Sequence, residues 1–242
     1  MRCVAKLSFG VAAYAASGPP PYNEPDFVWP SQSDTGDLGA ARLPLPILLR
    51  RRVGPIGQAA LRAAWALPRV EHARFVFASR HGEFDRTLTM LEQVAAEDGP
   101  SPADFSLGVH NALAGLLSVS TRNHCGHTAL AAGVDSFGFG LMEAAVCLLE
   151  RPEEPVILVY YDAVLPQGYP DTVQACAETT MALALMLVQP CQAPRRVAMV
   201  ATPIGGAEPG EAAAAVFLRF LRTSASQACA TGERMRWDWH ND

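Results

Sequence analysis

The chain has 242 residues, of which 50% are hydrophobic and 18% are charged, and its formal net charge is −5. This length suits one large domain or two small ones, and the acidic balance offers no basic field for nucleic acid or an anionic membrane surface. No apolar run approaches the about 18 to 20 residues that a membrane-spanning helix needs, and the six cysteines show no CxxC pairing. We therefore expect a cytoplasmic protein with reduced thiols, without disulfides or bound zinc.

Two interpretations are open for the N-terminal segment Met1 to Ala16. Basic residues followed by the run LSFGVAAYAA loosely imitate a secretory signal, but a serine and a glycine weaken the apolar run. We therefore predict a first strand over residues 2–9 and keep the signal-like segment as the alternative. Residues 17–37 are rich in Pro, Gly, Asn, Asp and Ser, which predicts a loop anchored by Phe27 and Trp29.

The middle of the chain alternates helical and strand patterns. Apolar residues at helical spacing predict three helices, over residues 56–67, over 85–96, and from 101 towards 117 with interruptions at Asn111 and Gly115. The run ARFVFA predicts a strand over 73–78. The loop SRHGE at 79–83 follows this strand, and loops in that place commonly carry function.

A buried helix is predicted over residues 133–149, because apolar residues surround its axis with little polar stripe. The short apolar run 127–132 before it is predicted as a central strand, and PVILVYY at 155–161 as a strand buried on both faces. Two strands joined as a hairpin are predicted next, over residues 181–188 and 196–201. A helix over 211–221 and a polar C-terminal tail over 223–242 follow them. This order favours one α/β domain over residues 1–222, with a mainly parallel sheet and helices on its faces.

The turn that opens the buried helix allows more than one function. Asp135 or Ser136 can cap the helix start, since a capping oxygen there is worth about 0.5 to 2 kcal/mol. The sequence Gly133 to Gly138 also has the appearance of a nucleophile elbow, but it is GxxSxG where an elbow has GxSxG. A serine acyl-transfer enzyme or hydrolase using Ser136 would have to recruit Asp162 and a histidine, either His110 or His81.

Four stretches together resemble a known family: SRHGE at 79–83, SPADFSLGVHNALAGLLSV at 101–119, ALAAGVDSF at 129–137, and YYDAVLPQGYP at 160–170. They are similar to the β-ketoacyl synthase-like N-terminal domain family, in particular to its short members in aryl polyene, fatty-acid and polyketide pathways. The resemblance implies a thiolase-like half fold, with a mainly parallel mixed sheet, flanking helices and one buried central helix.

In that family, a working ketosynthase carries its nucleophilic cysteine at the head of the buried helix. Aligning helix to helix puts Val134 or Asp135 at this position, so the nucleophile is missing. The catalytic histidines of a ketosynthase come from a second half of the fold, which this sequence does not contain. The resemblance therefore implies a non-catalytic subunit of the chain-length-factor type, without a cofactor, that forms a heterodimer with an active ketosynthase.

The same resemblance suggests roles for other residues. On the buried helix, Phe137, Phe139 and Met142 could line a tunnel or simply fill the core. His110 and Asn111 are further tunnel or interface candidates, although a histidine in an apolar helix is usually a hydrogen-bonded core residue.

Two short motifs complete the list of candidates. The basic run of Arg50, Arg51 and Arg52 could dock an acidic acyl carrier protein or could be a solvated helix entry. In HCGH at 124–127, three potential ligands within four residues cannot by themselves surround a metal ion, so no metal site is expected.

Overall fold

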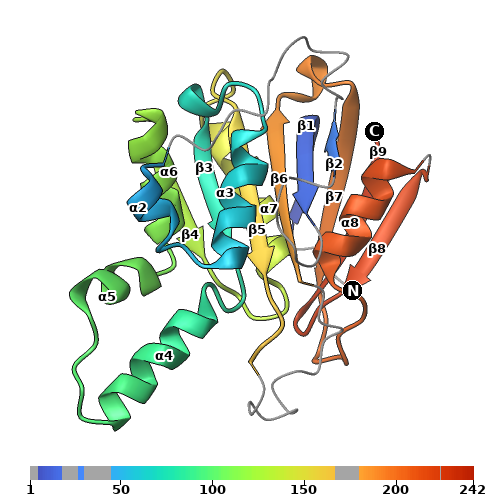
Figure 1. The fold of residues 1–242 in the computed structure, drawn as a ribbon. Coiled ribbons are helices and arrows are strands. Elements are labelled where there is room, and N and C mark those ends of the chain that lie inside the picture. The colour runs from blue at the N-terminus through green and yellow to red at the C-terminus, as the bar shows by residue number, and fades with distance from the viewer. Residues whose placement is uncertain (1–4, 18–26, 30–44, 167–179, 224) are drawn as a thin grey trace.

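A computed structural model describes residues 5–17, 27–29, 45–166, 180–223 and 225–242 of the chain. One mixed sheet with helices on both faces forms the domain (Figure 1). The strands follow the order β4-β3-β5-β6-β1-β7-β9-β8, and β2 pairs with β1. Their bounds are β1 Ala5–Ser17, β2 Phe27–Trp29, β3 Arg74–Ala78, β4 His127–Leu130, β5 Val156–Asp162, β6 Met181–Val188, β7 Arg195–Pro203, β8 Gln227–Thr231 and β9 Met235–Asn241.

Two helical layers cover the sheet and enclose two hydrophobic cores. One core lies under α7 and α8 and includes Phe137, Phe217 and Trp237. The other lies under α3 and α6 and includes Leu61 and Leu117. The helices are α2 Ile47–Arg50, α3 Pro55–Trp65, α4 Phe84–Ala95, α5 Pro102–Gly108, α6 Ala112–Thr121, α7 Ser136–Glu150 and α8 Ala213–Arg222.

The predicted elements with a strong periodic pattern are confirmed, and so is the α/β class. The helices expected over 56–67, 85–96 and 211–221 match α3, α4 and α8 within a few residues. The interrupted pattern after residue 101 is two helices, α5 and α6, because the backbone at Val109 is extended between them. In the described part of the chain, no helix is both long enough and apolar enough to cross a membrane.

The sheet is less parallel than the sequence predicted. Parallel ladders join β4 to β3 and β3 to β5, whereas every other pairing is antiparallel. The expectation of a mainly parallel sheet therefore holds only for the β4-β3-β5 side. The predicted hairpin of β6 and β7 is wrong, because β1 lies between these strands and pairs with both. Strand β1 runs to Ser17, well beyond the predicted residues 2–9.

Two further predictions are corrected at the edges of the sheet. The strand before the buried helix, β4, is an edge strand and not a central one, and it pairs only with β3 among the described strands. The segment 223–242 is not a loose polar tail, because β8 and β9 extend the sheet beyond β7. The alternating pattern of β9 places Trp237 and Trp239 on its inner face, where both are fully buried. The domain therefore extends past residue 222.

Candidate functional site

The turn before α7 has the geometry of an elbow, and its polar side chains form hydrogen bonds within the protein. Gly133 has a φ of +62°, a backbone conformation that side chains with a Cβ rarely adopt. The backbone N–H of Ala132 donates to Ser136 Oγ at 2.9 Å, and this hydroxyl donates to the Gly133 carbonyl at 2.7 Å. Ser136 is buried, so its hydroxyl serves to close the turn.

Asp135 binds the C-terminal hairpin rather than its own helix. Its side chain is fully buried, and no side-chain hydrogen bond caps α7. Oδ1 accepts a hydrogen bond from Trp237 Nε1 at 2.9 Å, and Oδ2 accepts one from the backbone N–H of Arg234 at 3.0 Å. The prediction that Asp135 caps the helix is therefore wrong. Its carboxylate instead accepts hydrogen bonds from Trp237 and Arg234, which lie about 100 residues later in the chain. The carboxylate ties the start of α7 to the turn between β8 and β9.

Close packing between α7 and β9 completes this contact. A Cβ atom on Gly138 would overlap the indole ring of Trp237, so only glycine leaves room there. Phe139 packs edge-on against the same indole, with ring centroids 5.2 Å apart. Phe137 contacts the rings of Phe217 and Trp239. The start of α7 is thus covered by the chain's own C-terminal strand β9.

The predicted tunnel residues lie on two different faces of the sheet. Phe137 is buried in the core under α7 and α8, and the half-buried Phe139 and Met142 pack against the same core. Val134 is half-buried in the turn before α7. His110 and Asn111 are exposed at the start of α6, on the α3 and α6 face. The structure therefore does not bring the α7 candidates together with His110 and Asn111.

A cavity of about 300 Å³ lies beside His110, at the carboxyl ends of β3 and β5. His81 and Tyr161 line it, and burial lowers the pKa of His81 and raises that of Tyr161. Asp162 holds the loop that carries His81, because its carboxylate accepts hydrogen bonds from Ser79 Oγ at 3.1 Å and from two backbone N–H groups of this loop. Asp162 therefore positions the SRHGE loop.

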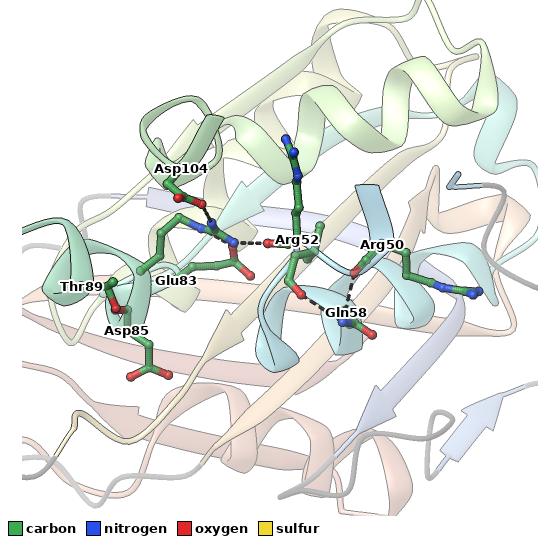
Figure 2. Close-up of polar contacts among 9 residues, drawn as sticks. Arg50, Arg52, Gln58, Glu83, Asp85, Thr89 and Asp104 are labelled. Carbon is green, nitrogen blue, oxygen red and sulfur yellow. Dashed lines mark hydrogen bonds and ion pairs between the residues drawn. The ribbon is translucent and has the colours of Figure 1, made fainter. Parts of the chain in front are cut away.

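A second cavity, of about 240 Å³, lies on the other side of this loop, between the start of α3 and helix α4. Arg86 braces its wall: Nη1 donates to Asp104 at 2.7 Å, Nε lies 3.4 Å from Glu83, and Nη2 donates to the Arg52 carbonyl. Figure 2 shows Glu83, Asp104 and Arg52 converging on this point. Sequence reasoning missed Arg86, although Asp104 belongs to the SPADF motif that it singled out.

Glu83 is the most deeply placed charge of this group. Its side chain is only 7% exposed, and Oε1 lies against Gly54 and Gly57 in the first turn of α3. A Cβ on Gly57 would overlap this oxygen, so the glycine makes room for the carboxylate. Burial raises the pKa of Glu83, and the nearby Arg86 opposes that shift.

The three arginines predicted to dock a carrier protein lie at the end of α2. Their backbone is fixed, since Gln58 Nε2 donates to the carbonyl of Arg50 at 3.2 Å and to that of Val53 at 2.9 Å. The side chains of Arg51 and Arg52 are exposed, and Arg50 is partly exposed. They follow directly on the exposed apolar residues Ile47, Leu48 and Leu49.

The alternative of a serine enzyme using Ser136 finds no matching geometry among the described residues. The Ser136 hydroxyl contacts backbone atoms, and in the described part of the chain no histidine hydrogen-bonds to it. His110 and His81 line a cavity on the opposite face of the sheet. Within the described ranges there is also no cluster of three or more His, Cys, Asp or Glu side chains that could hold a metal ion.

Comparisons with known proteins agree with this architecture. The family model for the N-terminal domain of beta-ketoacyl synthase matches residues 23–240. One similar structure is the complex of the ketosynthase ApeO with its chain length factor ApeC, from Xenorhabdus doucetiae. A chain of this complex is 23% identical to the present chain, with a TM-score of 0.76. The match covers 97% of this chain and 99% of that one.

More distant solved structures show the same fold. The ishigamide ketosynthase/chain length factor is 13% identical, with 81% of this chain and 67% of that chain covered and a TM-score of 0.55. A beta-ketoacyl synthase from Burkholderia phymatum is also 13% identical, with 83% and 65% covered and a TM-score of 0.52. No curated protein matches the sequence. These solved structures thus show the thiolase-like half fold of the chain.

Proposed function

Because the chain belongs to the β-ketoacyl synthase N-terminal domain family, we propose that it is a non-catalytic subunit of the chain-length-factor type. It pairs with an active ketosynthase in fatty-acid, polyketide or aryl polyene biosynthesis. Two of the solved structures with this fold are named as ketosynthases with chain length factors, which supports the proposal.

The bonding of Asp135 is the observation that carries this proposal. Condensation by a ketosynthase needs a nucleophile that can accept an acyl group, and a thiolate is the group suited to this step. Val134 and Asp135 are the two positions that the resemblance aligns with this nucleophile. Asp135 is a fully buried carboxylate, with one oxygen bonded to Trp237 and the other to the backbone of Arg234. A side chain engaged in this way holds a hairpin in place and does not carry an acyl chain.

The edge strand β4 supports pairing with another subunit. Its outer edge has no neighbour among the described strands, and residues 128–130 are only half-buried. Val119, on α6 beside this strand, is also exposed. An edge strand next to exposed apolar side chains is a ready site for pairing with another chain. The basic run of Arg50, Arg51 and Arg52 is in turn proposed to attract the acidic acyl carrier protein that delivers the substrate.

Co-expression with the ketosynthase of the same pathway tests the proposal. We expect the two chains to elute together in size-exclusion chromatography, and the products to change in length when this chain is left out. An Asp135→Cys variant alone is expected to show no condensing activity. A persistent monomer together with unchanged product length would refute the proposed function.

A further inference from the structure

Helices α4 and α5 form an arm that extends away from the body of the domain (Figure 1). The arm comprises residues 84–108. Neither helix has a buried residue, and their main helical contacts are with each other and with α6. Nevertheless, Leu88, Leu91 and Val94 recur at helical spacing on one face of α4. An amphipathic helix normally buries such a face, and within the described part of the chain this one is not buried.

The apolar side chains of the arm are exposed to an extent that is unusual for a free surface. Leu91 is 54% exposed, Val94 57% and Phe105 63%, and Val109, just after α5, is 44% exposed. Single exposed apolar residues are common, but three on one small arm and a fourth directly after it indicate a contact surface.

The arm is held in a defined position before any partner binds. Arg86 on α4 donates hydrogen bonds to Asp104 on α5 and to the carbonyl of Arg52 in the body of the domain. Asp104 and Arg52, the two acceptor residues, are labelled in Figure 2. Gly108 packs closely against Met90, where a Cβ would lie 2.8 Å from the methionine methyl group. A preorganised surface loses little conformational entropy on binding, which favours association.

The charge of the arm selects its partner. It contains five acidic residues and one basic residue, a formal charge of −4. Arg86 pairs with Asp104, so four exposed carboxylates remain: Asp85, Glu92, Glu97 and Asp98. By contrast, residues 47–52 carry three arginines and no acid. An acidic carrier protein is repelled by the arm and attracted to Arg50, Arg51 and Arg52, which leaves the arm for a different partner.

We propose that the α4–α5 arm docks into an apolar groove on the ketosynthase subunit, and that Lys and Arg side chains form the rim of this groove. The inference rests on the proposed function, since it assigns a surface and a complementary chemistry to the same partnership. The apolar side chains fill the groove, while the acidic side chains pair with its rim and set the orientation. This contact is additional to pairing at the edge of β4.

Site-specific photo-crosslinking in the full-length chain tests the inference. Benzoylphenylalanine replaces Leu91 in one variant and Leu149 in a control, because Leu149 is equally exposed but lies at the end of α7. Each variant is co-expressed with the ketosynthase of its pathway and irradiated, and the adducts are identified by mass spectrometry. We expect the ketosynthase to be linked at position 91, next to Lys or Arg residues, and not at position 149.

The other outcomes separate the inference from the proposed function. Co-elution with the ketosynthase but no adduct at position 91 overturns the arm contact and leaves the partnership intact. An adduct with a carrier protein or with a second copy of this chain overturns the assigned occupant, and failure to co-elute at all overturns both proposals. As a second readout, Glu92→Lys should slow association about tenfold at low salt, and a rate equal to that of wild type counts against the acidic rim.

Discussion

Replacing Asp135 tests the contact that seals the elbow. Asp135→Ala removes the acceptor of both Trp237 Nε1 and the Arg234 backbone N–H, and Trp237 is fully buried. Each buried donor left without a partner costs about 1 to 3 kcal/mol. We therefore expect the variant to lose about 3 kcal/mol of unfolding free energy. Asp135→Asn keeps an acceptor for Trp237 but turns an amide donor towards Arg234, and it should lose about 1 to 2 kcal/mol.

Urea unfolding followed by tryptophan fluorescence measures these losses. Asp135→Cys should be destabilised as strongly as Asp135→Ala, because a thiol is a poor acceptor for either donor. Asp85→Ala is the matched control, since this carboxylate is exposed, and it should change stability by less than about 0.5 kcal/mol. If Asp135→Ala is no less stable than the control, the carboxylate does not hold the hairpin and the structural role assigned to it is wrong.

Three further predictions follow from the packing and the buried charge. Gly138→Ala should lose about 1 to 3 kcal/mol of unfolding free energy, because its methyl group overlaps the indole of Trp237. The control, Gly115→Ala, has open space around it in α6 and should be neutral or stabilising. Equal effects of the two variants in urea unfolding would contradict the close packing at Gly138. Burial raises the pKa of Glu83, so the folded chain holds this proton more tightly and the associated stability is lost as pH rises through the folded pKa. Glu83→Gln should therefore gain stability relative to wild type as the pH rises above about 4.3, the ordinary pKa of glutamate. A difference that is constant with pH argues against a buried, titrating carboxylate. Finally, Phe139 and His110 lie on opposite faces of the sheet. Only one of the variants Phe139→Ala and His110→Ala should therefore lengthen the products of a co-expressed ketosynthase. Product lengths are measured by mass spectrometry, and equal lengthening by both variants would refute this separation.

Local sequence patterns were sufficient for the elements whose own residues specify them. The spacing of apolar residues in α3, α4 and α8 reflects one buried or amphipathic face per helix, and the continuous apolar runs of β5 and β6 reflect burial on both faces. The same reasoning located a turn and a buried helix with no cysteine at its head. It could not order the strands, because β1 pairs with β6 and β7, which begin more than 160 residues after β1 ends.

The candidate site was only partly visible in the sequence for the same reason. Asp135 and Ser136 stood out as polar residues in an apolar stretch, and capping was the local explanation for both. The hydrogen bond of Asp135 joins it to Trp237, 102 residues away, in a segment whose alternating pattern was too short to be recognised as a strand. The bracing of the arm by Arg86 likewise depends on the Arg52 carbonyl, 34 residues earlier.

The sequence by itself determined the fold class and the family resemblance, because composition, periodicity and motifs are properties of neighbouring residues. Only the tertiary structure decided that Asp135 anchors the C-terminal hairpin, that the tunnel candidates lie on two faces, and that an acidic arm projects from the body. Each of these depends on which distant segments meet, and such long-range contacts are fixed by the packing of the whole sheet with its helices.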